Sequence, residues 1–392
     1  MRRGLRIGVV LTAAAVMPAQ AKPFIPDSDG QVLERLPLSA TDPVYRRLGA
    51  LRGQLKNQPD NLPLALTLAR GYADLGRSTG DPRYLGYAQA ALAPWWDLDQ
   101  APPQVMVLRA FLLQTTHQFD AALADLAKVL AMDPGNAQAR LMRATVLQVT
   151  GDYAGARDEC EALRALTKEL VWTVCLTSVD GVTGRLRDSY ERLRSALDRF
   201  GGAQPEIRDW ALTGIAEMAA RAGLTTEADG YFRAALAIDA ADGYLLGAYA
   251  DFLLDSGRPS EAAALVKDHT RADPLLLRYA LALQALHSPE LQARVAELSD
   301  RFAAAHLRGD KVHLREEARF TLNLLGEPQA ALRLASENWR VQKEPADFRV
   351  LVEAALAAHD PAQTDAARDW LRVTGLEDIQ IRNIFSAVLK PD

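Results

Sequence analysis

The apolar positions of this chain recur with the spacing of an α-helix rather than that of a strand. In the stretch 137–150, Leu141, Ala144 and Leu147 follow one another at intervals of three residues, which places them on one face of a helix. Gly151 comes directly afterwards and predicts the end of the helix, because glycine readily adopts the left-handed conformation found after a helix C-terminus.

The segment after this glycine predicts a second helix that packs back against the first. Its apolar stripe runs through Ala156, Cys160 and Leu163, again at helical spacing. A small alanine where the two helices cross lets their backbones approach closely. Since one such hairpin cannot bury its apolar face alone, neighbouring hairpins must stack.

The same arrangement returns along the chain at a constant interval. Ala122 and Ala156 lie 34 residues apart, and so do Ala228 and Ala262. A short polar turn precedes each of these alanines, and a bulky or apolar residue follows four positions later: Leu126, Cys160, Phe232 and Val266. A period of this length is typical of helical-repeat proteins.

This pattern resembles the tetratricopeptide repeat, which has a small residue at position eight, glycine near fifteen, alanine at twenty and proline at thirty-two. Matching residues are Ala110, Ala122 and Pro134 in unit 103–136, Ala144, Gly151 and Ala156 in 137–169, Gly184 and Ala196 in 170–203, Ala216, Gly223 and Ala228 in 209–242, and Ala250, Gly257, Ala262 and Pro274 in 243–276. Weaker units are 62–97, 312–345 and 346–380, where Asp360 stands in the place of glycine, and 277–311 is degenerate with an uncertain register.

The resemblance implies an all-α fold, a right-handed α-solenoid of stacked helix-turn-helix repeats over residues 43–392. We expect a capping helix over 43–56, another over 379–389, and no linker that separates independent domains. Residues 22–42 contain Pro23, Pro26 and Pro37 and are interpreted as an extended lead-in.

The first 21 residues have the pattern of a signal peptide. Arg2, Arg3 and Arg6 precede a short apolar stretch, and Ala19 and Ala21 supply the small residues that a signal peptidase requires. We therefore expect cleavage after Ala21 and a periplasmic location, with no membrane span in the mature chain.

Composition narrows the range of functions. The chain has 392 residues, of which 49% are hydrophobic and 24% charged, so it can bury a large core and is not expected to be disordered. Its formal net charge of −5 does not favour nucleic-acid binding.

A protein or peptide partner in the cell envelope is the expected ligand. If the resemblance holds, positions two, five, nine and twelve of each first helix face a concave groove, and no Lys/Asn set there matches the carboxylate clamp of some family members. The candidate partner-binding residues are Gln104, Val107, Phe111, Gln114, Thr145, Gln148, Trp210 and Tyr244. The aromatic members would be anchors for a bound segment. The alternative, which the repeat pattern favours slightly, is that they are ordinary packing residues between repeats.

The sequence does not predict a catalytic site, a cofactor-binding site or a metal site. Residues 76–80 satisfy the G-x-S-x-G pattern, but Ser78 follows a predicted helix and not the strand that this motif requires. His306, Asp310 and His313 have helical spacing for a metal site, yet Gly309 interrupts them.

The two cysteines, Cys160 and Cys175, stand on consecutive predicted helices. A disulfide is feasible there in an oxidising compartment, and a free Cys160 thiol in the core is the alternative.

The sequence thus predicts an exported, non-enzymatic scaffold or adaptor that binds a protein or peptide without a cofactor. Three alternatives stay open: an interaction subunit of an export or assembly machine, an enzyme with an unrecognised site in 277–311, and a structural spacer. The spacer is favoured if the chain's own tail fills the groove. The identity of the partner and the oligomeric state are not predicted.

Overall fold

The computed structural model of the chain describes residues 42–79, 81–309 and 312–388. The expected signal peptide and nearly all of the expected lead-in lie outside these residues. Within the described part all regular structure is helical, which confirms the predicted all-α fold.

The helices form successive antiparallel pairs. The first helices of the pairs are α2 (Leu62–Thr79), α5 (Pro103–Thr115), α7 (Ala137–Thr150), α9 (Glu169–Asp180), α11 (Pro205–Ala222), α13 (Gly243–Asp255), α15 (Asp273–Ala285), α17 (Leu314–Phe320) and α19 (Pro345–Ala357). The second helices are α3 (Arg83–Ala91), α6 (Phe119–Met132), α8 (Tyr153–Ala162), α10 (Leu186–Arg199), α12 (Thr225–Leu236), α14 (Pro259–Val266), α16 (Leu291–Leu307), α18 (Pro328–Val341) and α20 (Pro361–Thr374).

Elements outside the pairs complete the solenoid. Two flanking helices, α1 (Pro43–Asn57) and α21 (Ile379–Val388), lie before the first pair and after the last pair. The remaining elements are α4 (Ala93–Trp96), the 3-10 turns Leu163–Ala165 and Lys267–His269, and a π-helical turn, Thr321–Leu325, that continues α17.

The hairpin of α7 and α8 shows how the sequence produces each pair. Asn136 caps α7 by accepting a hydrogen bond from the amide of Ala139 at 3.0 Å. Gly151 ends the helix with a φ of 91°, and Asp152 then caps α8 through the amide of Gly155 at 2.9 Å. The turn is therefore stabilised by a glycine between two side-chain caps.

Three of these turns place a histidine, not a glycine, in the left-handed conformation. His117, His287 and His359 have φ values of 58°, 50° and 53°, which histidine tolerates better than most residues. In the last pair the left-handed residue is His359, while Asp360 caps α20 by accepting from the amide of Gln363 at 3.0 Å. His287 marks the turn between α15 and α16, so this pair begins at α15, upstream of residue 277.

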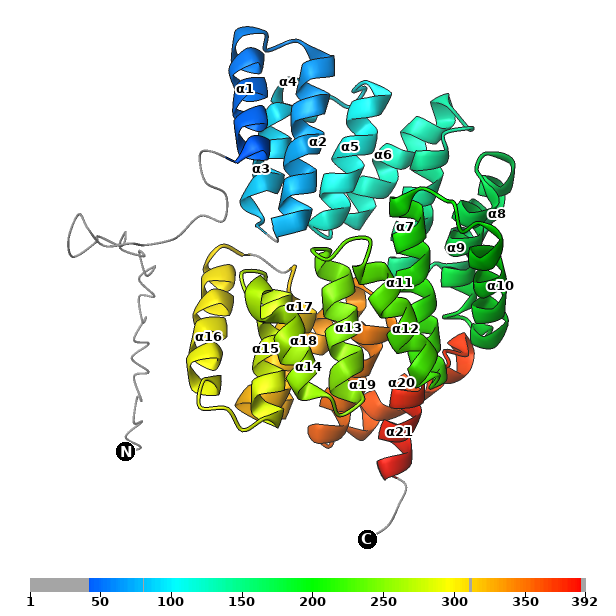
Figure 1. Cartoon of the computed structure of the whole chain (residues 1–392), viewed down its shortest axis with the longest axis vertical. Helices are drawn as coiled ribbons and strands as arrows, with labels where there is room; N and C mark the ends of the chain where they lie inside the picture. Colours follow the sequence, from blue (N-terminus) through cyan, green and yellow to red (C-terminus); the bar gives the residue numbers. More distant parts are fainter. Residues whose placement is uncertain (1–41, 80, 310–311, 389–392) are drawn as a thin grey trace, which may run out of the picture.

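Successive first helices contact one another, so the pairs stack and the solenoid curves (Figure 1). The chain passes from the blue helices through cyan and green to the yellow and red helices, and α13 comes back into contact with α2. Buried leucine, alanine and aromatic side chains form successive clusters between the helices along the solenoid, with Phe232, Phe348 and Met106 almost fully buried.

The last helices, α17 to α21, form what we term the C-terminal limb, residues 314–388. This limb packs against the turns that join the helices of earlier pairs. The amide of Lys343 donates to the carbonyl of Val149 at 2.7 Å, and the Tyr153 hydroxyl donates to the carbonyl of Lys343 at 3.0 Å. Further along, the amide of Leu186 donates to Glu377 Oε1 at 3.0 Å.

Apolar packing reinforces this contact. Val182, in the turn after α9, lies in one buried cluster with Phe348, Val352, Leu376 and Ile381. The limb thus closes the curved solenoid on itself. None of the described helices is both long enough and apolar enough to cross a membrane.

Candidate partner-binding cavity

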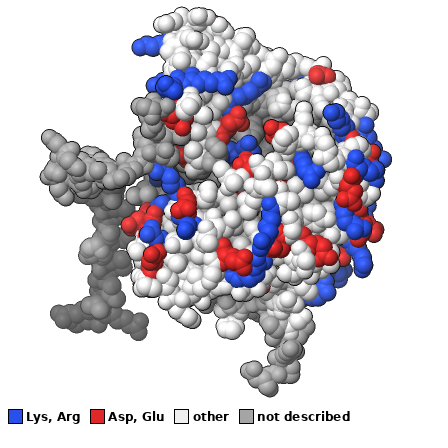
Figure 2. Space-filling model, in the orientation of Figure 1, with Lys and Arg blue, Asp and Glu red and all other residues white. Residues whose placement is uncertain are grey.

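A cavity of about 2830 Å³ lies inside the curve, bounded by the first helices of the middle pairs and by the C-terminal limb. Its walls combine aliphatic and aromatic side chains with many charged ones. On the outer surface, basic and acidic side chains are interspersed on the face that Figure 2 shows. The cavity lies on the inner side of the curved solenoid and is lined by residues of several first helices.

Five of the predicted partner-binding residues line this cavity: Phe111, Thr145, Gln148, Trp210 and Tyr244. They come from α5, α7, α11 and α13, so the structure brings together residues that are up to 133 positions apart.

The other three predicted residues do not line the cavity. It reaches only the C-terminal half of α5, so Gln104 on the first turn is exposed elsewhere, and Val107 is only 8% exposed within the core. Gln114 is partly buried outside the lining. For Val107, ordinary repeat packing is the role that the structure shows.

Trp210 and Tyr244 present aromatic surface to the cavity. Tyr244 is 61% exposed, and its hydroxyl donates to Glu217 Oε1 at 2.7 Å. The negative charge of Glu217 raises the pKa of Tyr244 well above its ordinary value, so this phenol stays protonated. Trp210 is partly buried against the cores of two neighbouring repeats.

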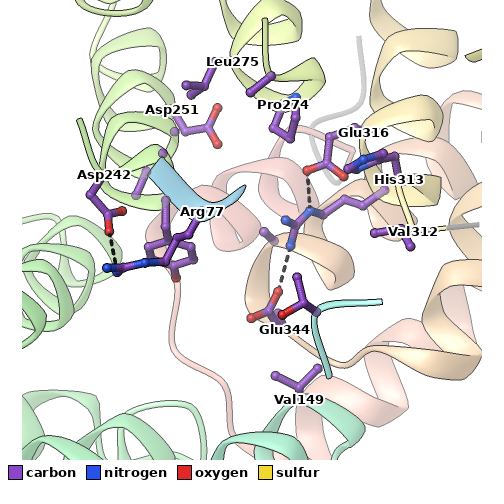
Figure 3. Close-up of a pocket in the computed structure, with 18 of the residues that line it drawn as sticks. Arg77, Val149, Asp242, Asp251, Pro274, Leu275, Val312, His313, Glu316 and Glu344 are labelled. Atoms are coloured by element: carbon purple, nitrogen blue, oxygen red, sulfur yellow. Dashed lines mark hydrogen bonds and ion pairs between the residues drawn. The ribbon is translucent and has the colours of Figure 1, made fainter. Parts of the chain in front are cut away.

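Several ion pairs lie on the cavity wall (Figure 3). The sequence did not predict them. Arg77, at the end of α2, reaches Asp242 with an Nη1–Oδ2 distance of 3.5 Å. Arg315 contacts Glu316 at 3.1 Å and Glu344 at 2.9 Å. Arg315 and Glu316 are neighbours on α17, whereas the pairs Arg77–Asp242 and Arg315–Glu344 join separate elements that no local spacing in the sequence indicates.

Asp251, on α13, is a carboxylate of the cavity wall that two arginines neutralise. Arg278 Nη2 lies 2.7 Å from its Oδ2, and Arg319 Nη1 lies 2.6 Å from its Oδ1. Burial alone would raise the pKa of Asp251, but the two guanidinium groups outweigh burial and hold this pKa below its usual range. The carboxylate therefore stays ionised.

Asp209, on α11, has a different environment. Its Oδ1 is buried without a hydrogen-bond partner in the described structure. Burial and the negative charges of Asp242 and Asp239 raise the pKa of Asp209 to about 6, although Arg77 opposes this shift. This side chain is a carboxylate that lacks a full counter-charge.

Several charged side chains of the segment 277–311 are already paired. Arg301 contacts Asp273 at 2.8 Å and Glu297 at 2.6 Å, and Arg278 is held by Asp251. His306 contacts Glu317 at 2.6 Å, whereas Asp310 lies outside the described residues. Among the described residues, no group of histidine, cysteine, aspartate or glutamate side chains is arranged to hold a metal ion.

Cys160 on α8 and Cys175 on α9 form a disulfide, with their Cα atoms 5.5 Å apart. Both residues are buried in the core between the two repeats. The residue of the G-x-S-x-G pattern, Ser78, belongs to the last turn of α2, so a helix precedes it where a nucleophile elbow has a strand.

The stacked hairpins around a lined cavity define a helical-repeat protein of the class that serves as protein-interaction scaffolds. Residues 115–173 match the family model described as tetratricopeptide repeat. This part of the chain therefore matches the tetratricopeptide repeat that the spacing of its small residues and turns predicts.

Solved structures with similar folds have low sequence identity to this chain. PilW, described as a widely conserved type IV pilus biogenesis factor, is 18% identical over 51% of this chain and 94% of PilW, with a TM-score of 0.40. A tetratricopeptide repeat protein from Parabacteroides merdae is 11% identical over 74% of this chain and 97% of its own, with a TM-score of 0.37. YrrB, described as having an unusual peptide-binding site, is 21% identical over 46% of this chain and 90% of YrrB, with a TM-score of 0.30. A search of curated proteins found no match.

Proposed function

We propose that this protein is an exported scaffold that holds a segment of another protein in its central cavity, without catalysis. The observation that carries the proposal is the cavity itself. Its volume of about 2830 Å³ exceeds the roughly 300–1,000 Å³ of small-molecule pockets, and it has room for an extended peptide.

The lining suits such a segment. Phe111, Trp210 and Tyr244 offer aromatic surface, while Thr145 and Gln148 offer hydrogen-bonding groups. Aromatic side chains contribute strongly to binding when a partner covers them. Because the described helices of the C-terminal limb line this space and leave it open, we favour binding of a partner over a role as a spacer.

Export is supported by the disulfide between Cys160 and Cys175. Such bonds persist mainly in oxidising compartments, including the bacterial periplasm. Together with the signal-peptide pattern of residues 1–21, this bond favours a periplasmic scaffold.

The test is an affinity pull-down from envelope extract with the mature chain and two double variants. Trp210→Ala with Tyr244→Ala removes both aromatic anchors, and we expect the affinity for the captured partner to fall at least about tenfold. Trp172→Ala with Tyr87→Ala is the matched control, because these aromatics lie outside the cavity lining.

Circular dichroism should show the same helical signal for all three proteins. Equal capture by the cavity variant and the unmodified chain would contradict the proposal. Equal loss in both double variants would contradict it as well, since the cavity would then have no special part in binding.

A further inference from the structure

The wall of the cavity formed by α11, α13 and the cap of α13 is acidic. It presents Glu206, Asp209 and Glu217 from α11, Asp242 from the cap, and Asp251 and Asp255 from α13. On this wall the one cationic side chain from the same helices is Arg221, near the end of α11, within the described lining. Such a wall needs positive charge from elsewhere.

Two of these six residues, Asp251 and Asp255, already bind arginine side chains from a remote part of the chain. Arg319 Nη1 lies 2.6 Å from Asp251 Oδ1. Arg349 contacts both carboxylate oxygens of Asp255, at 2.6 and 2.8 Å. Both arginines belong to the C-terminal limb, so the wall recognises guanidinium groups presented by another segment, with the paired geometry that carboxylates favour.

Asp209 and Asp242, on another part of the wall, form no ion pair with an arginine of the limb among the described contacts. Asp209 has a buried oxygen without a hydrogen-bond partner in the described structure. Asp242 has Arg77 at 3.5 Å, but that arginine side chain is 64% exposed, so the pair is loose and a stronger cation can replace it.

Aromatic residues stand directly beside these carboxylates in the sequence and on the same wall. Trp210 follows Asp209 on α11, and Tyr244 lies two residues after Asp242. A guanidinium or ammonium group near an aromatic face gains a further attraction to the ring. This part of the wall thus combines negative charge with aromatic surface.

We infer that the cavity accepts a basic segment of a partner protein, whose arginine or lysine side chains pair with Asp209 and Asp242 beside Trp210 and Tyr244. This inference rests on the proposed function and names the chemistry of its partner. The bound segment would continue the row of arginine contacts that the C-terminal limb makes at Asp251 and Asp255.

The test uses hexaarginine amide as the probe and the mature full-length chain, with binding followed by isothermal titration at low ionic strength. Asp209→Asn with Asp242→Asn removes the two charges, and asparagine preserves the cap of α13 because it is as good an N-cap as aspartate. We expect the affinity to fall about tenfold or more.

The matched control is Asp365→Asn with Asp369→Asn. These aspartates lie on α20, their side chains are 71% and 74% exposed, and they are not part of the cavity lining. The control removes the same charge from the molecule, so it should change the affinity by less than about twofold. Hexaglutamate should not bind.

Three results would overturn the inference: no binding of hexaarginine to the unmodified chain, unchanged affinity in the cavity variant, or the same loss in both variants. One of these results could occur while the variant with alanine at Trp210 and Tyr244 still loses its partner in the pull-down. In that case the proposed scaffold function holds, and the bound segment is neutral or apolar. If both tests fail, the cavity is not the binding site.

Discussion

Asp209 is the residue at which the cavity departs most from ordinary protein packing. Its partly buried carboxyl group faces two other aspartates, Asp239 and Asp242, and these surroundings raise its pKa to about 6 from the ordinary 3.8. A buried charge without a full partner destabilises the folded state. Groups of this kind are found where a protein binds something.

This shift predicts a pH-dependent stability. Between about pH 4 and pH 6 the folded chain binds more protons at Asp209 than the unfolded chain does, so the free energy of unfolding falls as pH rises through this window. Asp209→Asn should therefore be more stable than the unmodified chain at about pH 7, by about 1 kcal/mol after allowance for solvent screening, and equally stable at about pH 4. Urea denaturation at both pH values measures the difference.

The control for this experiment is Asp365→Asn, on the exposed surface of α20. It should not reproduce the change with pH, because its carboxyl group is 71% exposed. A stability gain for Asp209→Asn of the same size at both pH values would contradict the account.

At the scale of elements, the docking of the C-terminal limb depends on two glycine turns that touch. Gly375 ends α20 with a φ of 72°, and a Cβ atom built on it would lie 3.2 Å from the Cα of Gly184. Gly184 is itself in the left-handed region, with a φ of 81°. Side chains at these turns would push the limb away from the pair α9 and α10.

Gly375→Ala should therefore cost more stability than Gly326→Ala. Gly326 has nearly the same φ, 70°, but nothing lies within 4 Å of the position of its Cβ. Backbone strain alone should cost each variant about 1–2 kcal/mol, and Gly375→Ala should lose about 1 kcal/mol more through the contact with Gly184.

Hydrogen exchange on α21 distinguishes the two variants further. Its amides should exchange faster in Gly375→Ala than in Gly326→Ala, because only the first substitution disturbs the docking of the limb. Identical stability and exchange in the two variants would show that the contact between the turns does not hold the limb.

The helical pairs could be predicted because each depends on residues within a few positions of one another. Leu141, Ala144 and Gly151 define a face and an end of α7 without reference to the rest of the chain. The turns at His287 and His359 were harder to recognise than the polar turn at His117, since histidine lacks the glycine signal but still adopts the left-handed conformation. That substitution explains the uncertain register near 277–311 and the apparent mismatch at Asp360.

At the scale of the whole molecule, sequence reasoning placed Phe111, Trp210 and Tyr244 in one groove because the family pattern assigns each to the same face of its own repeat. It did not predict that the groove would become a cavity. Arg349 and Asp255 are 94 residues apart, and their contact depends on the curvature accumulated over several repeats. No local pattern encodes such a contact.

The C-terminal limb closes the molecule around the cavity. The acidic wall of this cavity then has two kinds of position. Asp251 and Asp255 bind arginines of the limb, whereas Asp209 and Asp242 face open cavity. The same wall thus serves internal closure in one part and, in our proposal, binding of a partner in the other.

The central claim, that a partner segment enters the cavity, is tested most directly by photocross-linking from a single position. A photoreactive phenylalanine analogue is placed at Tyr244, inside the cavity, or at Tyr87, which is similarly exposed at 48% but lies outside the lining. We expect a covalent adduct with the captured partner from position 244 and none from position 87. An adduct from position 87 alone, or from neither position while the partner is still captured, would contradict the account.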